Sequence, residues 1–186
     1  AELDRSEAVT EVRGMARRPF DPAREGLTKA SYRRGDVLDR DSLALLFDGA
    51  DVAVHLAFSI FGARERTRRV NLEGSRNVFR TAIEAGVERI VYASSVGTYA
   101  RGPKDRAVDE SWSHTGIPAS FYSRHKAAVE AILDSFEQAH PEVRDGALVQ
   151  DLNGDACRFA NLNRAFGEDR RRQDVRGLVA QLARNV

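Results

Sequence analysis

The chain has 186 residues, of which 42% are hydrophobic and 31% charged, and its formal net charge is +1. This length suits one α/β domain with a full core, and the near-neutral charge predicts no general attraction to nucleic acid or to anionic membranes. The single cysteine, Cys157, excludes an internal disulfide and suits a reducing cytoplasm, which is the expected location. No apolar run approaches the ~20 residues of a membrane span, and no signal peptide is visible.

The first fifty residues predict two short strands followed by a helix. Val9–Met15 alternates in polarity and is β-branched at several positions, which is typical of a strand. Phe20–Lys29 has the composition of a loop, and a short strand follows at about Ser31–Arg33. Asp41 is a suitable N-cap for a helix over Asp41–Phe47.

The middle of the chain predicts strands and longer helices in alternation. Asp51–Leu56 has the composition of a buried strand, a long helix is expected over roughly Thr67–Ala85, and Ile90–Ser94 is the next strand. The polar stretch Arg101–Ser120 suits either an active-site loop or a folded-back surface loop. A last helix begins at about Ser120, and its apolar residues recur at helical spacing, which predicts that one face packs on the core.

Two polar residues stand at the start of that last helix. Tyr122 and Lys126 are four residues apart, which puts both side chains on one helix face, one turn apart. A phenol titrates near pH ~10, and a neighbouring ammonium favours its deprotonated form, as general acid–base catalysis at neutral pH requires. Tyr and Lys are common on amphipathic helices, so a half-buried tyrosine beside an unrelated surface lysine is the alternative interpretation.

Three upstream segments give this pair a context. They are Val54-His55-Leu56-Ala57, Val70-Asn71-Leu72-Glu73-Gly74-Ser75-Arg76-Asn77 and Glu88-Arg89-Ile90-Val91-Tyr92-Ala93-Ser94-Ser95-Val96-Gly97-Thr98-Tyr99. In this order, with the tyrosine–lysine pair after them, they resemble the short-chain dehydrogenase/reductase superfamily, specifically its extended branch of epimerases, dehydratases and reductases. The resemblance covers roughly residues 9–140. It implies a Rossmann-like α/β fold, a doubly wound, mostly parallel sheet with helices on both faces.

The resemblance implies catalytic roles for four residues. Tyr122 would be the general acid/base, and Lys126 would assist it and bind the nicotinamide ribose. Ser95, which stands four residues before Tyr99, corresponds to the family's serine and would position the reacting oxygen. Asn71 would support the tyrosine and the lysine through a backbone or water contact.

The resemblance also implies contacts with NAD or NADP. Asp36 and Val37 correspond to the family's adenine contacts, Leu56, Ala57 and Phe58 to its ribose and pyrophosphate side, and Ala93, Tyr122 and Lys126 complete the set. Phe58 departs from the small residue usual at its position. An acid after the second strand of this fold accepts from the ribose 2′-hydroxyl, whereas arginine suits a 2′-phosphate. Arg17 and Arg18 therefore favour NADP, and two solvated loop arginines are the alternative.

Three further features have simpler interpretations. The basic run Arg64–Arg69 has the composition of a solvated helix face, with phosphate binding as the alternative. His55, alone inside a strand, predicts a hydrogen-bonded core residue. Asp151–Asp155 superficially suggests a calcium loop, but Ala156 and Leu162 stand where such a loop requires glycine and an acid. No metal site is therefore predicted.

The chain departs from the family pattern at its start. The family's first strand and glycine-rich turn would precede Val9 by roughly two dozen residues, and the chain begins at Ala1 without an initiator methionine. A trimmed chain, omitted stretches and a non-catalytic descendant are the three interpretations, and without the turn weak NAD(P) binding and no activity are expected. The slot between the strands Val9–Met15 and Asp51–Leu56 is expected to hold another segment, such as Ala147–Gln150, or a partner chain.

The sequence therefore predicts a Rossmann-like domain over residues 1–144, lacking its first strand–helix unit, with residues 145–186 as its extension and a closing helix at Asp174–Arg184. The expected function is that of an NAD(P)-dependent oxidoreductase or epimerase/dehydratase acting on a hydroxyl or carbonyl substrate; a non-catalytic binding or regulatory protein is the alternative. Sugar nucleotides, steroids and small ketones all remain open as small-molecule substrates. The helices around Val70–Ile83 and Val129–Phe136 resemble those that pair in family dimers, so a homodimer is expected.

Overall fold

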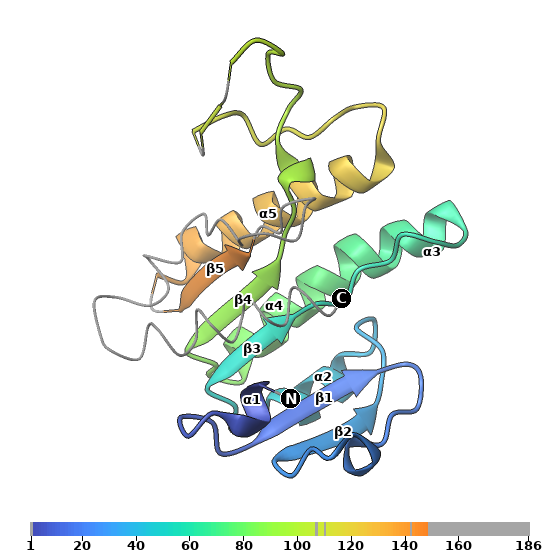
Figure 1. Ribbon diagram of the computed structural model, residues 1–186, viewed down its shortest axis with the longest axis vertical. Helices are drawn as coiled ribbons and strands as arrows, with labels where there is room; N and C mark the ends of the chain where they lie inside the picture. The colour runs from blue at the N-terminus through green and yellow to red at the C-terminus, as the bar shows by residue number, and fades with distance from the viewer. Residues whose placement is uncertain (1, 107, 110, 142, 149–186) are drawn as a thin grey trace.

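The computed structural model describes residues 2–106, 108–109, 111–141 and 143–148 (Figure 1). The strands are β1 (Val12–Ala16), β2 (Ala30–Arg34), β3 (Val52–His55), β4 (Arg89–Ala93) and β5 (Arg144–Leu148). The α-helices are α1 (Glu2–Arg5), α2 (Arg40–Phe47), α3 (Arg64–Arg68), α4 (Ser75–Glu84) and α5 (Phe121–Ala139). Two 3₁₀ turns, η1 (Pro22–Glu25) and η3 (Val96–Thr98), and a π-helix, η2 (Arg69–Gly74), complete the described elements.

All pairings between described strands are parallel, and they form two sheets. β1 pairs with β2, with Val12 opposite Ala30, and β4 lies between β3 and β5. The strands of both sheets point the same way in Figure 1, so their carboxyl ends face one side of the molecule. Successive parallel strands joined by helices are typical of a Rossmann-like fold.

The expectation that Ala147–Gln150 fills the slot between the first and third strands is wrong for the residues described. Ala147 lies in β5 opposite Tyr92 of β4, on the side of β4 away from β3. α5 connects β4 to β5, so the sheet continues in the direction already taken from β3 to β4.

The β1–β2 sheet is joined to the rest through α2 and α4, which pack against each other. Arg40 at the start of α2 forms an ion pair with Glu84 at the end of α4. Asn77 of α4 donates a hydrogen bond to the Val37 carbonyl (3.2 Å). Val37, just after β2, is buried, so the end of β2 is fixed against α4 without a strand pairing.

The core lies between the strands and the helices behind them in Figure 1. Phe79 of α4 is fully buried and makes edge-to-face contacts with Tyr92 of β4 and His55 of β3. β3 is buried on this face only: Ala53 and His55 are 2% and 3% exposed, whereas Val52 and Val54 are 40% and 36% exposed. The strand predicted at Asp51–Leu56 is therefore present, but it is buried on one face and exposed on the other.

The single helix predicted over Thr67–Ala85 is instead three consecutive segments. α3 begins at Arg64, η2 widens to a π-helix over Arg69–Gly74, and α4 follows at Ser75. π-turns inside α-helices are rare and often occur at functional sites. Here the wide turn contains Asn71, which is fully buried.

Other boundaries differ by a few residues. β1 begins at Val12 rather than Val9, and the loop predicted at Phe20–Lys29 contains the turn η1. Asp39, not Asp41, caps α2, because its carboxylate accepts from the Asp41 amide. The features discussed at Asp151–Asp155 and Asp174–Arg184 lie outside the described residues.

The apolar stripes considered for two-fold pairing are buried within the chain. Val78 and Phe79 on α4 and Val129 and Leu133 on α5 all belong to the core. Phe121, at the start of α5, is a large apolar residue that stays exposed (41%). The homodimer therefore remains a prediction without an exposed stripe to support it. Among the helices described, none is long and apolar enough to cross a membrane.

The close approach of η2 to the end of β2 can be tested at Gly74. A Cβ added there would lie 2.5 Å from Val37 Cγ2. Gly74→Ala gains up to about 1 kcal/mol of helix propensity, but overpacking costs about 1–3 kcal/mol, so we expect a net loss of up to about 2 kcal/mol in the free energy of unfolding. Urea unfolding followed by circular dichroism measures it.

Gly14→Ala is the matched control. Its added Cβ would meet atoms only at 3.7 Å and 3.8 Å, which is ordinary contact, so its free energy of unfolding should not fall. Equal stability of the two variants would contradict the tight packing at Gly74.

Candidate active site

The carboxyl end of β4 leads directly into a tight turn that presents Ser95. The Ser95 hydroxyl accepts a hydrogen bond from the Gly97 amide (3.0 Å) and so caps the 3₁₀ turn η3. The side chain is only 7% exposed. Ligands in parallel α/β sheets bind at the carboxyl ends of strands, and Ser95 occupies such a position.

The first turn of α5 is held against the same turn. Ser120 caps α5 by accepting from the Ser123 amide (3.3 Å), and the Ser123 hydroxyl donates to the Gly97 carbonyl. A Cβ placed on Gly97 would lie 3.2 Å from Tyr122 Cε1 and 3.3 Å from Ser95 Oγ. The structure thus brings the Tyr122 ring and the Ser95 hydroxyl to the same point, beside a residue that has no side chain.

Lys126, one turn further along α5, is buried in a cage of backbone and aromatic groups. Its Nζ donates to the Ala93 carbonyl (2.5 Å) and lies 4.1 Å from the centre of the Phe58 ring. The rings of Tyr92 and Tyr122 are 4.8 Å and 5.9 Å from the same nitrogen. The residue is 4% exposed, so the ammonium is compensated by one carbonyl dipole and by ring faces.

Burial lowers the pKa of Lys126 from its ordinary value to about 8, and the nearby Glu130 carboxylate opposes the shift. Removal of an ammonium from water disfavours its charged form. A pKa of about 8 still leaves the side chain mostly protonated at neutral pH. Lys126 is therefore a cation poised close to its titration point and next to the Tyr122 ring.

Glu130 forms a second buried polar cluster one turn beyond Lys126. Its carboxylate accepts from the Ser94 hydroxyl and lies 3.4 Å from His114 Nδ1. Burial raises the pKa of Glu130. His114 comes from the loop between η3 and α5, which folds back so that the Gly116 amide donates to the Thr98 carbonyl (2.8 Å). The cluster connects this loop to the lysine-bearing helix.

Sequence reasoning missed Glu130 and Ser94. The signal for Glu130 was present, because it stands four residues after Lys126, on the same helix face. Ser94 is the residue before Ser95, and neighbouring residues along an extended chain point to opposite sides. Its hydroxyl reaches Glu130 while Ser95 faces Gly97.

Asn71 supports the site indirectly. Its Oδ1 accepts from the Ser59 amide (2.7 Å), and its Nδ2 donates to the Ser59 carbonyl (2.9 Å) and to His125 Nδ1 (3.2 Å). The side chain therefore fixes the residue after Phe58, whose ring contacts both Tyr122 (5.4 Å between ring centres) and Lys126.

A family model for the NAD dependent epimerase/dehydratase family matches residues 2–186. The chain belongs to this family. Its resemblance to the extended short-chain dehydrogenases and reductases, first drawn from motifs, is thereby confirmed, and so is the Rossmann-like fold.

The curated relatives align with only part of this chain. It is 35% identical over 113 residues to cinnamoyl-CoA reductase 1 from Oryza sativa subsp. japonica (55% of this chain, 33% of that protein). It is 32% identical over 114 residues to a decarboxylating sterol-4-alpha-carboxylate 3-dehydrogenase from Candida albicans (60% of this chain, 31% of that protein). The chain spans about a third of the length of these curated relatives. Its fold is similar to that of uronate dehydrogenase from Agrobacterium tumefaciens, with a TM-score of 0.66 at 22% identity, over 77% of this chain and 52% of that one.

The remaining cofactor candidates of this epimerase/dehydratase family member lie at the ends of other strands. Leu56 and Ala57 follow β3, next to Phe58. Arg17 and Arg18 follow β1 and are exposed, as expected of loop arginines. Asp36 follows β2, and its carboxylate accepts from the Leu38 amide (3.1 Å) and so caps the turn there.

His55 is a structural residue. Its Nε2 is 2.8 Å from the Ser75 hydroxyl, it is 3% exposed, and burial and the charge of Lys126 lower its pKa to about 3. It therefore stays neutral in the core, as predicted. Within the part of the chain described, no group of three or more His, Cys, Asp or Glu residues could hold a metal ion.

Burial and the Glu130 charge act in opposite directions on the pKa of Lys126, and this pKa can be measured. The chain has three lysines, Lys29, Lys104 and Lys126, so NMR of protein with carbon-13-labelled lysine should resolve each of them. We expect Lys126 to titrate with a pKa of about 8. Glu130→Gln removes the opposing negative charge, so the Lys126 pKa should fall further.

Lys104 is exposed, and its signals serve as the internal reference in both spectra. An unchanged Lys126 pKa in Glu130→Gln would show that the carboxyl does not act on the lysine.

Proposed function

We propose that this chain carries the catalytic core of an NAD(P)-dependent oxidoreductase or epimerase/dehydratase that acts on a hydroxyl or carbonyl substrate. The observation that carries the proposal is the convergence of Tyr122 and Ser95 at Gly97, with the buried ammonium of Lys126 beside the tyrosine. A phenol, a hydroxyl and an ammonium at the carboxyl ends of parallel strands suit proton transfer to or from a substrate oxygen.

Each residue has a distinct task in this proposal. The Tyr122 hydroxyl gives a proton to the substrate oxygen or takes it away. The Ser95 hydroxyl donates a hydrogen bond to that oxygen and holds it beside the phenol. Lys126 supplies a positive charge that stabilises a phenolate while the proton is away. Asn71 keeps Phe58 and Ser59 in place behind this pair.

The residues at the site fit a nicotinamide cofactor. An ammonium has three hydrogen-bond donors, and Lys126 has one acceptor among the described residues, the Ala93 carbonyl. Lys126 would therefore hold the ribose hydroxyls, with Ala93 and Phe58 beside it. The bound cofactor would supply the hydride chemistry. Phe58 already covers Lys126, so its ring would border the ribose closely.

The relatives support this range of reactions without choosing among them. Cinnamoyl-CoA reductase and sterol-4-alpha-carboxylate 3-dehydrogenase are oxidoreductases, and uronate dehydrogenase and a UDP-Glc/GlcNAc 4-epimerase share the fold. The proposal would be contradicted if the protein bound the dinucleotide but catalysed no reaction with it.

Replacing the proposed acid/base tests the chemistry. In a form of the protein that turns over substrate, Tyr122→Phe keeps the ring against Phe58 but removes the proton donor. We expect kcat to fall by at least ~10²-fold, with NAD(P)H affinity little changed. Steady-state nicotinamide absorbance gives kcat, and calorimetric titration gives the affinity. Ser135→Ala, which removes an exposed hydroxyl from the same helix, is the control and should keep full turnover. Near-normal turnover of Tyr122→Phe would assign the proton to another group.

Cofactor preference is tested at the end of β1. Replacing both Arg17 and Arg18 with alanine should weaken NADPH binding by about tenfold or more, since charge-assisted hydrogen bonds to a phosphate would be lost. NADH binding should be little changed. Calorimetric titration of the two cofactors measures the difference, and Arg24→Ala, an exposed arginine paired with Asp21, is the matched control. If the double variant binds NADPH as tightly as the unaltered protein does, Arg17 and Arg18 are solvated loop residues without a role in cofactor binding.

A further inference from the structure

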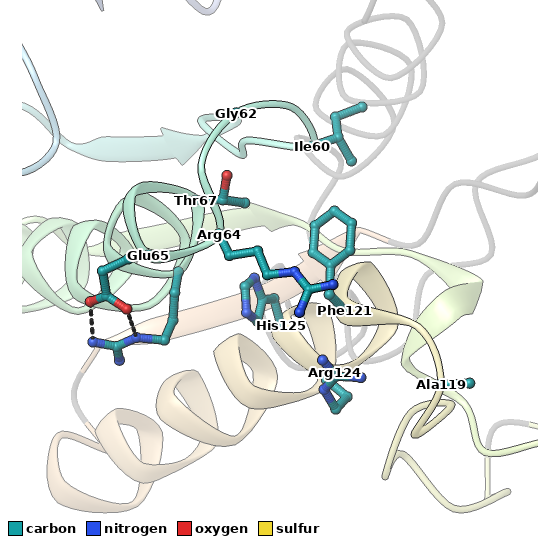
Figure 2. Close-up of a pocket in the computed structure, with 10 residues that line it drawn as sticks. Ile60, Gly62, Arg64, Glu65, Thr67, Ala119, Phe121, Arg124 and His125 are labelled. Atoms are coloured by element: carbon teal, nitrogen blue, oxygen red, sulfur yellow. Dashed lines mark hydrogen bonds and ion pairs between the residues drawn. The ribbon is translucent and has the colours of Figure 1, made fainter.

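A pocket with a volume of about 670 Å³ lies between α3 and the first turn of α5 (Figure 2). One wall comes from the segment Ile60–Arg68 and the other from Ala119, Phe121, Arg124 and His125. Figure 2 shows Arg64 extending from α3 toward the turn of α5 that carries Phe121 and His125. None of these residues has a task in the proton transfer proposed above.

The charges around the pocket do not balance. Arg64, Arg68 and Arg124 line it together with one carboxylate, Glu65, which leaves an excess of two positive charges (three minus one). Glu65 is engaged with Arg68, at 2.9 Å. Arg124 donates to the Pro118 carbonyl, which carries no formal charge. Within the described residues, Arg64 has no hydrogen bond or ion pair, so its guanidinium is free to bind a ligand.

Two of these arginines also act on His125. Burial, the charge of Arg124 and the charge of Arg68 all lower its pKa. Its Nδ1 lies 3.2 Å from Asn71 Nδ2, and an amide nitrogen only donates. His125 must therefore be neutral and carry its proton on Nε2 while this bond exists.

Apolar surface borders the same opening. Ile60 and Phe121 line the pocket and are 49% and 41% exposed, and Phe61, next to Ile60, is 87% exposed. Exposed apolar groups beside an uncompensated cluster of cations suit a ligand with an anionic group on an apolar or aromatic body.

We propose that this pocket binds an organic anion, a carboxylate or a phosphate monoester, with Arg64 as its main charged contact and Phe121 and Ile60 against its apolar part. Arg124 adds a second guanidinium at the same opening. We assign this anion to the substrate, and this assignment rests on the proposed function. Asn71 provides the connection, because it bonds both His125 at the pocket and Ser59, the residue after Phe58. Binding of the anion itself does not depend on turnover.

The test uses the complete 186-residue chain and the four histidine rings, His55, His114, His125 and His140. Inorganic phosphate, phenyl phosphate and benzoate are titrated in turn, and the His125 ring is followed by nitrogen-15 NMR as a function of pH. Phenyl phosphate or benzoate should raise the His125 pKa saturably, by about one unit. Tighter binding of phenyl phosphate identifies a phosphate monoester, tighter binding of benzoate a carboxylate, and a weaker response to inorganic phosphate supports the apolar contact.

Arg64→Ala and Arg66→Ala form a matched pair, because both residues are exposed on α3 and only Arg64 lines the pocket. Arg64→Ala should weaken binding of the preferred anion by about tenfold, and Arg66→Ala should leave it unchanged. An absent or non-saturable His125 response, or equal losses in the two variants, would overturn the proposal.

The outcomes also separate this pocket from the proposed function. If His125 ignores all three anions while Tyr122→Phe lowers turnover as expected, the pocket proposal fails and the proposed function stands. If the anions act as expected but Tyr122→Phe keeps near-normal turnover, the pocket stands and the proposed function fails.

Discussion

The buried ammonium of Lys126 is the constraint on which the rest of the site depends. Removal of a charge from water is costly unless nearby groups compensate it. Here the compensation comes from the Ala93 carbonyl, the faces of three aromatic rings and the Glu130 carboxylate. A pKa of about 8 shows that this compensation is partial. β4 must therefore end at Ala93, and Phe58 must follow β3, for the lysine to stay charged inside the protein.

The position of the tyrosine follows from a second constraint, the absence of a side chain at Gly97. The Ser95 cap and the Tyr122 ring both approach this residue so closely that a methyl group would meet them at 3.2–3.3 Å. Ser123 then holds α5 by donating to the Gly97 carbonyl. Gly97 thus connects the segment that follows β4 to the first turn of α5. A hydroxyl, a phenol and an ammonium are ordered before any ligand arrives, which is the preorganisation that proton transfer benefits from.

The order of strands and helices and the shared face of Tyr122 and Lys126 were predictable because both depend on local periodicity. The contacts that set the electrostatics of the site were not predictable, because they join segments that are distant in the sequence. Phe58 contacts Lys126 across 68 positions (126 minus 58), and His114 contacts Glu130 from a loop. The π-helix was hidden for a related reason. Its sequence has helical periodicity throughout, and the wide turn depends on tertiary packing of Asn71 and Gly74. The exposed face of β3 was missed because composition does not tell which faces of a strand helices cover.

The arginines beside His125 have a consequence for the active site even without a ligand. The Asn71 amide is fixed in orientation because its Oδ1 accepts from the Ser59 amide, so its Nδ2 can only donate to His125. Protonation of His125 would place a second donor against that nitrogen and break the bond. Burial, together with the charges of Arg124 and Arg68, lowers the His125 pKa and favours the neutral ring that accepts from Asn71. Asn71 in turn bonds the backbone of Ser59 through both its side-chain atoms, next to the Phe58 ring that lies over Lys126. An anion that neutralises the charges of Arg68 and Arg124 would raise the His125 pKa and so weaken the hydrogen bond between His125 and Asn71. The pocket and the tyrosine–lysine pair are therefore coupled through Asn71.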